Sequence, residues 1–199
     1  MDSFALTEYV CQSQVIDQQV INNPDCIVGD IINESPKVLL WGDSNAAHYI
    51  GLIGAFAEKA GFQFRNLQIG SCPPIDSDAI KFASSKRIAD CQSSAEVTIA
   101  AVKKFKIVII SANWSEYYLR SDDFFESFFR TVDSLLGAKK KVILIGKVPI
   151  IPMFDRLCRE KELSYPFLTC KTASAPLAKE IATVNRKLKE YALNTSVVY

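Results

Sequence analysis

The sequence predicts an α/β protein, a three-layer α/β/α sandwich built on a mostly parallel sheet. From residue 37 onward, short apolar runs typical of buried strands alternate with longer segments of helical periodicity. This alternation is the pattern of βαβ units, whose helices cover both faces of a parallel sheet. The chain has 199 residues, of which 49% are apolar and 23% charged. That length and composition allow one domain of ordinary size with a substantial core.

Four short apolar runs carry the strands of this sheet. They cover residues 37–41, 62–67, 106–111 and 141–146, and each is rich in β-branched or bulky residues. The chain ends in "SVVY" at 196–199, which has the composition of a strand. We therefore expect a C-terminal strand that is incomplete within these residues.

Helical segments follow the first three strands. Apolar residues at three- and four-residue steps predict a helix from Ala46 to Ala60, which Gly61 ends. Ser93 with Glu96 has the spacing of a capping box and predicts a helix that continues to about Lys104.

Three more helices are expected towards the C-terminus. Ser121 is placed to cap a phenylalanine-rich helix that ends before Gly137, and its apolar stripe is typical of core packing. A short helix over 155–163 and a longer one over 176–191 complete the pattern. Residues 1–36 do not alternate, so we expect an N-terminal arm over 1–36 and an α/β domain over 37–199.

Charge and hydropathy exclude several classes of function. The net charge is +1, which gives no electrostatic basis for binding nucleic acid or an anionic membrane. No apolar run reaches the roughly 18 residues that a transmembrane helix needs. Met1 is followed by Asp2 and mixed sequence, unlike a signal peptide. We interpret the chain as an excised domain of a larger exported protein.

The six cysteines predict an oxidising compartment. They fall into three local pairs, which are Cys11 with Cys26, Cys72 with Cys91 and Cys158 with Cys170. Local closure is the simplest of the possible pairings, and structural disulfides are typical of exported proteins. The alternative is six reduced thiols packed as small apolar groups. With no C-x-x-C spacing and a single histidine, the sequence implies no metal and no cofactor.

Three loops should meet at one edge of the sheet, because the carboxyl ends of parallel strands lie together. Ser44 follows the first strand, Gly70 the second and Asn113 the third. A serine hydroxyl, a glycine N–H and an asparagine amide together are the parts of an acyl-transfer site with an oxyanion hole. Taken alone, Ser44 is equally suited to cap a helix, and Asn113 to bond its own loop. We expect Asp43 to brace the turn through backbone N–H groups.

The stretches "WGDSNAAHY", "IGSCPP" and "SANW" resemble the SGNH hydrolase superfamily. More narrowly, they resemble the extracytoplasmic SGNH domain fused to membrane acyltransferase-3 proteins, which transfer acyl groups, often acetyl, onto bacterial surface polysaccharides. The resemblance covers about residues 10–199. It implies Ser44 as the nucleophile, with Ser44 N–H, Gly70 N–H and the Asn113 amide as the oxyanion hole. The common motif has histidine where this chain has Asn45.

The same resemblance implies the wider function. We expect an O-acyltransferase domain that passes an acyl group, most simply acetyl, from an acyl-serine to a sugar hydroxyl of a cell-surface polysaccharide. A membrane acyltransferase domain would deliver the acyl donor, and the full-length protein would be periplasmic and tethered to the inner membrane. The alternatives are a carbohydrate O-acetyl esterase and a catalytically dead glycan-binding module. In such a module, aromatics after the third strand, namely Trp114, Tyr117 and Tyr118, would stack on sugar rings, but we favour packing as their use.

One element of the family pattern is missing. The family supplies its base from an Asp-x-x-His segment shortly after the last strand, and residues 1–199 contain no such segment. The single histidine, His48, lies one helical turn after Ser44 and is expected to line the site rather than act as the base. Either the chain is truncated, and a further polypeptide completes it, or the domain is degenerate. Little turnover is expected from residues 1–199 alone.

Overall fold

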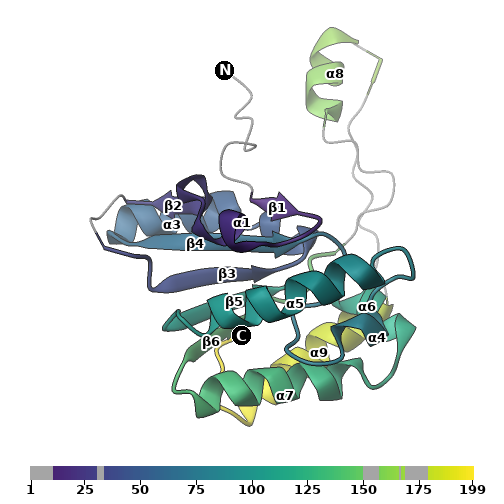
Figure 1. Cartoon of the computed structure of the whole chain (residues 1–199). Coiled ribbons are helices and arrows are strands. Elements are labelled where there is room, and N and C mark those ends of the chain that lie inside the picture. Colours follow the sequence, from purple (N-terminus) through teal and green to yellow (C-terminus); the bar gives the residue numbers. More distant parts are fainter. Residues whose placement is uncertain (1–10, 31–33, 150–156, 166, 169–178) are drawn as a thin grey trace.

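The computed structural model describes residues 11–30, 34–149, 157–165, 167–168 and 179–199. These residues form a six-stranded sheet in the order β1-β4-β3-β5-β6, with β2 paired to β4 beside this path (Figure 1). The strands are β1 (Gln12–Ser13), β2 (Ile27–Gly29), β3 (Val38–Gly42), β4 (Gln63–Ile69), β5 (Ile107–Ser111) and β6 (Lys141–Leu144). All pairs are parallel except β2 with β4. The predicted α/β class and mostly parallel sheet are confirmed.

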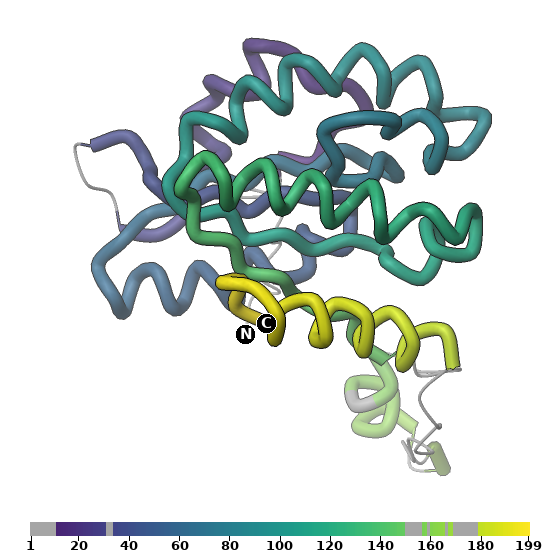
Figure 2. The backbone as a smooth tube through the Cα atoms, turned by 90° about the horizontal axis from the view of Figure 1, so that it is seen from below, coloured from purple at the N-terminus to yellow at the C-terminus, as the bar shows by residue number. Residues whose placement is uncertain are grey.

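Ten helical segments connect or flank these strands in the described residues. They are α1 (Gln18–Asn22), the 3₁₀ turn η2 (Pro24–Cys26), α2 (Ser44–Ala47), α3 (Ile50–Ala60), α4 (Ala79–Phe82), α5 (Ile88–Val102), α6 (Trp114–Arg120), α7 (Phe124–Gly137), α8 (Cys158–Ser164) and α9 (Lys179–Leu193). Figure 2 shows α5, α7 and α9 crossing the molecule as roughly parallel tubes. No helix in the described ranges combines the length and apolar composition needed to cross a membrane.

The sheet separates two apolar cores, because successive side chains of a strand point to opposite faces. In β3, Leu39 and Trp41 belong to the larger core, which α5, α6, α7 and α9 cover. Val38 and Leu40 belong to the smaller core, beneath α2 and α3. Both faces of the sheet are therefore covered, as the near-continuous apolar strands predicted.

Two helix starts differ from the predictions. The helix α5 begins at Ile88 rather than Ser93, and the Ser93 hydroxyl donates to Asp90 O at 3.1 Å inside it, so the predicted capping box is wrong. The helix α7 begins at Phe124 after Asp123, and Ser121 instead ends α6. In both places the apolar pattern predicts the helix correctly, but the serine is not its N-cap.

The chain between residues 44 and 60 forms two helices instead of one. The helix α2 ends at Ala47, with His48 as its C-cap, and α3 begins at Ile50 after Tyr49. Gly61 ends α3 with a left-handed conformation (φ 67°), as predicted. The break confines the segment that carries Ser44 to four helical residues.

The N-terminal segment belongs to the sheet. The first cysteine pair is present, and the Cys11–Cys26 disulfide closes the segment that contains α1. On either side of that segment, β1 and β2 both pair with β4. The side chain of Asn66, fully buried in β4, accepts from Cys11 N at 2.9 Å and donates to Cys26 O at 2.8 Å. The predicted arm is thus bonded covalently to itself and by hydrogen bonds to the sheet.

The remaining cysteine predictions agree as far as the described residues extend. Cys72 and Cys91 form a disulfide between the loop after β4 and α5. Cys158 is also disulfide-bonded, and its predicted partner Cys170 lies outside the described residues. The two described disulfides and the bonded Cys158 indicate folding in an oxidising environment.

The C-terminal residues pair with the edge strand β6, as "SVVY" predicted. Val198 forms a parallel bridge with Ile143. Its N–H donates to Val142 O at 3.1 Å, and its carbonyl accepts from Leu144 N at 2.8 Å. The chain at Val198 therefore runs towards the same sheet edge as β6.

Candidate active site

The three predicted site residues occupy equivalent places on adjacent strands. Gly42 in β3 pairs with Gln68 in β4 and with Ser111 in β5. Ser44, Gly70 and Asn113 each follow that row by two residues. Their strands are neighbours in the sheet, so all three residues lie at one edge, as predicted.

Gly42 allows the close strand packing beneath this edge. A Cβ atom at residue 42 would lie 1.8 Å from Ser111 O and 2.9 Å from the Ala46 Cβ. Neither neighbour can give way easily, because one is strand backbone and the other belongs to the helix that carries Ser44. Glycine at this position therefore brings β3, β5 and α2 together.

Asp43 is the polar centre of the edge. Its side chain is buried, with 1% of the residue exposed. Oδ1 accepts from Asn45 N at 2.7 Å, and Oδ2 accepts from Asn113 N at 2.9 Å and from the Tyr117 hydroxyl at 2.8 Å. The carboxylate thus braces its own turn, as predicted, and also joins that turn to the loop after β5.

This geometry shows which residue caps α2. The N-cap of α2 is Asp43, whose carboxylate accepts from Asn45 N, and Ser44 is the first helical residue. The alternative interpretation of Ser44 as a capping serine is therefore wrong. Ser44 is partly buried at the end of β3, and its side chain is not required to cap α2.

Gly70 lies beside β1 rather than facing an open loop. Its N–H donates to Ser13 O at 2.9 Å, which extends the β1–β4 ladder by one residue. A Cβ atom at Gly70 would lie 3.3 Å from the side-chain amide of Gln14. The Gly70 N–H, one of the three donors predicted for the oxyanion hole, is therefore engaged by Ser13 O in this structure.

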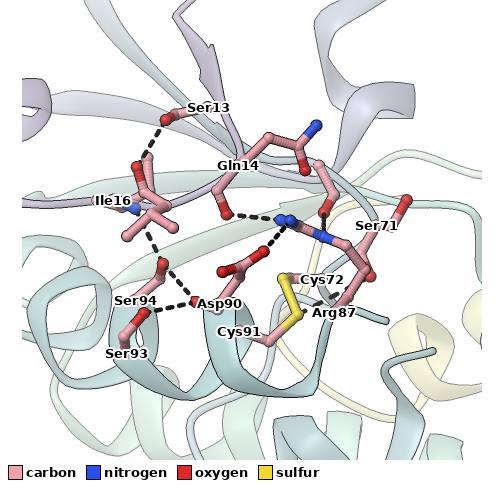
Figure 3. A network of polar contacts seen from close by, with 12 residues as sticks. Ser13, Gln14, Ile16, Ser71, Cys72, Arg87, Asp90, Cys91, Ser93 and Ser94 are labelled. Carbon is pink, nitrogen blue, oxygen red and sulfur yellow. Dashed lines mark hydrogen bonds and ion pairs between the residues drawn. A yellow bond between two sulfur atoms is a disulfide. The ribbon is translucent and has the colours of Figure 1, made fainter. Parts of the chain in front are cut away.

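A polar network fixes the loop after β4 (Figure 3). Arg87 donates from Nε to Gly70 O at 3.2 Å and from Nη2 to Gln14 O at 2.5 Å, and it pairs with Asp90. The Cys72–Cys91 disulfide ties the same loop to α5. The position of Gly70 is consequently set by α5 and β1 as well as by its own strand.

Asn113 is held at both its backbone and its side chain. While its N–H donates to Asp43, its Nδ2 donates to Glu116 Oε2 at 2.6 Å. Glu116 also pairs with Arg120, which donates to Phe82 O at 3.3 Å. One N–H of the Asn113 amide is thus engaged by Glu116, and an amide nitrogen carries two.

Lys147 is a site residue that the sequence reasoning missed. Its Nζ donates to Asn45 Oδ1, while Asn45 Nδ2 donates to Asp43 Oδ1 at 3.2 Å. Burial lowers the pKa of Lys147, and the charges of Asp43 and Glu116 oppose that change. Lys147 follows β6, so a search of all strand ends rather than the first three would have found it.

His48 and Trp114 differ from one another in exposure. His48 lies in the break between α2 and α3 with an exposed side chain, and within the described residues no hydrogen bond joins its ring to Ser44. Trp114 is fully buried, and its Nε1 donates to Ile145 O at 2.8 Å. The favoured interpretation of Trp114 as a packing residue is confirmed, and the alternative of stacking on sugars is excluded, because Trp114 is part of the larger core.

Comparison with known proteins adds two findings. The profile of the family described as "SGNH domain (fused to AT3 domains)" matches residues 10–199. The periplasmic domain of a lipopolysaccharide acetyltransferase from Salmonella ser. Paratyphi A has a similar structure, with a TM-score of 0.63 and 14% sequence identity. The similarity covers 98% of this chain and 74% of that one. No curated protein matches the chain significantly.

Proposed function

Since the chain belongs to the family of SGNH domains fused to AT3 domains, we propose that it is an O-acyltransferase domain whose nucleophile is Ser44. The observation that carries the proposal is the common register of Ser44, Gly70 and Asn113 on three adjacent strands. Those residues supply a hydroxyl, a backbone N–H and a side-chain amide at one edge. Nucleophilic acyl transfer requires these three kinds of group.

The proposed reaction has two steps. Ser44 Oγ adds to the acyl carbonyl of the donor and loses its proton to a base, and the donor group leaves as the acyl-serine ester forms. A sugar hydroxyl then adds to that ester, and Ser44 Oγ leaves and regains a proton. We propose acetyl as the acyl group and a bacterial cell-surface polysaccharide as the source of the accepting hydroxyl.

The oxyanion of each step would be bound by Ser44 N–H, the second N–H of the Asn113 amide and Gly70 N–H. Asp43 supports this arrangement, because it fixes the Ser44 turn and the Asn113 backbone together. Gly70 can join only when its bond to Ser13 opens. We propose that β1, which pairs with β4 through two residues, separates from Gly70 when a donor binds.

The base is proposed to be a histidine outside residues 1–199, because these residues contain only His48, and no hydrogen bond among the described residues joins its ring to Ser44. Such a histidine can belong to the same polypeptide or to a second one. A serine hydroxyl without a base is a weak nucleophile. The 199-residue chain is therefore expected to acylate slowly.

The setting of the reaction follows from the family and the disulfides. The family name records fusion to AT3 domains, so a membrane acyltransferase domain is the proposed source of the acyl donor. The two described disulfides, with the bonded Cys158, support an extracytoplasmic, periplasmic location. In the full-length protein the domain would then be tethered to the inner membrane.

A catalytically dead glycan-binding module is the second candidate. The observation that favours it is that Gly70 N–H and one Asn113 N–H already have partners. An O-acetyl esterase would use the same groups as the transferase, with water as the acceptor. The two enzymes differ only in whether acetate or an acetylated sugar is released.

The test is covalent labelling of the 199-residue chain with a fluorophosphonate, with and without added imidazole as a soluble base. Intact mass and peptide mapping should place one label on Ser44, and imidazole should accelerate the labelling. Ser44→Ala should abolish the label, whereas Ser115→Ala, a partly buried serine in the neighbouring helix α6, should not. A chain that is folded but unlabelled even with imidazole would support the dead module.

A second experiment separates the two enzymes. The full-length protein would receive an acetyl donor and an oligosaccharide acceptor, and products would be analysed by mass spectrometry. Acetylated oligosaccharide that disappears with Ser44→Ala supports the transferase. Free acetate alone, also dependent on Ser44, would reassign the protein as an esterase.

A further inference from the structure

A cavity lined by the start of β4, the N-terminal segment and the end of α5 lies away from Ser44. It has a volume of about 600 Å³ and a floor formed by Gln63 and Arg65, at the start of β4. The parallel strands are about 16 Å long, at five residues of roughly 3.3 Å each, so they separate this cavity from the Ser44 edge. A molecule bound there would not contact the groups proposed for acyl transfer.

The cavity contains a buried cation with few partners. Arg65 is 9% exposed, and Nη1 donates to Asn23 O at 2.8 Å. Among the described residues, no ion pair includes Arg65. A guanidinium has five N–H donors, and burial without an anionic partner is costly. Burial also lowers the pKa of Arg65, which reflects that cost.

The charges around Arg65 favour an anion. Lys104 also lines the cavity, and it is exposed two residues after the end of α5. Glu34 is the acidic residue of the lining, and its carboxylate is bonded to Lys37 at 2.8 Å. The hydrogen bond from Lys37 lowers the pKa of Glu34, and the charge of Lys106 adds to that effect. The charge of Glu34 is thus already balanced by its ion pair with Lys37.

The rest of the lining is largely apolar. Ile21 and Ile27 come from the disulfide-closed N-terminal segment, and Ala101 and Phe105 come from the end of α5 and the residues after it. Small-molecule sites typically have volumes of about 300 to 1,000 Å³, with apolar walls and a few placed polar groups. The cavity has this size and this distribution of groups.

We propose that this cavity binds a small organic anion, whose carboxylate or phosphate pairs with Arg65 and whose compact apolar part contacts Ile21, Ile27 and Phe105. Arg65 would donate two parallel N–H bonds to the anionic head, because guanidinium and carboxylate or phosphate groups match in this geometry. The exposed Lys104 ammonium would also attract the anion, and solvent would weaken this attraction. The site is independent of the proposed acyl transfer.

The test is a titration of the ¹⁵N-labelled chain with hexanoate and with hexyl phosphate, followed by amide chemical shifts. Hexanol is the neutral control with the same apolar part. We expect both anions to perturb the chemical shifts of amides around Arg65. Hexanol should bind at least roughly tenfold more weakly than either anion, because it lacks the hydrogen-bonded charge. Hexanoate against hexyl phosphate identifies the preferred head group. Equal binding of hexanol, or shifts confined to the Ser44 edge, would contradict the proposal.

Variants make the test specific. Arg65→Gln should weaken anion binding by about tenfold or more. Lys104→Glu should weaken it by roughly threefold, as expected of an exposed charge. Lys103→Glu is the matched control, an exposed neighbour outside the lining. If circular dichroism shows that Arg65→Gln is unfolded, Lys104→Glu against Lys103→Glu decides, and equal effects of those two would overturn the proposal. Ser44→Ala should bind as the parent does.

Discussion

The Asp43 carboxylate accepts a hydrogen bond from the backbone N–H of Asn113 at 2.9 Å, across 70 residues of sequence. This bond fixes the loop after β3 relative to the loop after β5. Because the same carboxylate also caps α2, the position of Ser44 and that of Asn113 depend on one buried side chain. The integrity of the edge therefore depends on Asp43, although Asp43 is not itself a proposed catalytic residue.

Asp43→Asn should destabilise the fold strongly. The amide places an N–H₂ group where one carboxylate oxygen now accepts, and it removes the charge from bonds with Asn45, Asn113 and Tyr117. We expect a loss of about 2 to 4 kcal/mol in the free energy of unfolding by urea titration. Asp122→Asn, an exposed change, should alter it by less than about 0.5 kcal/mol. Equal effects would show that the Asp43 bonds contribute little.

Tyr117→Phe tests the third bond of Asp43 and a pH dependence. Burial, together with the charge of Asp43 and its hydrogen bond, raises the pKa of Tyr117 well above its ordinary value. The folded state then keeps the phenol proton that the unfolded state loses near pH 10, so this contribution is present below about pH 10 and is lost as the pH rises further.

The expected result has two parts. At neutral pH, Tyr117→Phe should cost about 1.5 to 3 kcal/mol, as for one hydrogen bond to a charged acceptor. Above about pH 10 the variant should lose less stability than the parent. Tyr49, Tyr191 and Tyr199 also have raised pKa values, so part of the alkaline decline should remain. If the parent and the variant lost stability equally as the pH rose, Tyr117 would not contribute to the alkaline loss of stability.

Gly42→Ala should prevent the close packing of β3, β5 and α2. The added methyl would meet Ser111 O at 1.8 Å, so the strands would have to move. We expect a loss of roughly 3 kcal/mol or more, or no folded protein. Gly137→Ala is the control, since nothing lies within 4 Å of its Cβ position in α7. That change should be neutral or slightly stabilising, by up to about 1 kcal/mol in thermal or urea unfolding.

Removal of the first disulfide should destabilise the N-terminal segment. In the chain-entropy model a cross-link that closes about 15 residues contributes about 3 kcal/mol, and the Cys11–Cys26 separation is 15. The double variant Cys11→Ser/Cys26→Ser should therefore lose up to that amount. Hydrogen exchange should increase first in β1 and β2, which pair only with β4 among the described strands. Unchanged protection there would show that Asn66 and the strand ladders suffice.

Glu116→Gln tests the positioning of Asn113 under the proposed function. The variant weakens the acceptor that orients the Asn113 amide, and it removes the ion pair with Arg120. We expect fluorophosphonate labelling of Ser44 to slow by about tenfold, with folding retained. Glu126→Gln removes a comparable pair with Arg130 in α7 and should leave labelling unchanged. Equal rates for both variants would deny Glu116 this role.

Much of the fold follows from local sequence pattern. The strands β3, β5 and β6 were predictable because their apolar runs are buried on both faces, which requires apolar residues at successive positions. The two-residue strand β1 and the three-residue strand β2 were not, because so short a segment carries no period. Ser93 and Ser121 misled the helix boundaries, since a serine inside or after a helix looks the same in sequence as one that begins it.

The sequence by itself determined the class of the sheet, the cysteine pairing within the described residues and the set of strand-end residues that includes Ser44. Each depends on periodicity or on neighbours close in the chain. Only the tertiary structure decided that Asp43 accepts a hydrogen bond from Asn113 N, that Gly70 N–H donates to Ser13 O, and that Lys147 reaches Asn45. These contacts join residues that different strands bring together, and hydrogen-bond partners at such distances leave no trace in local spacing.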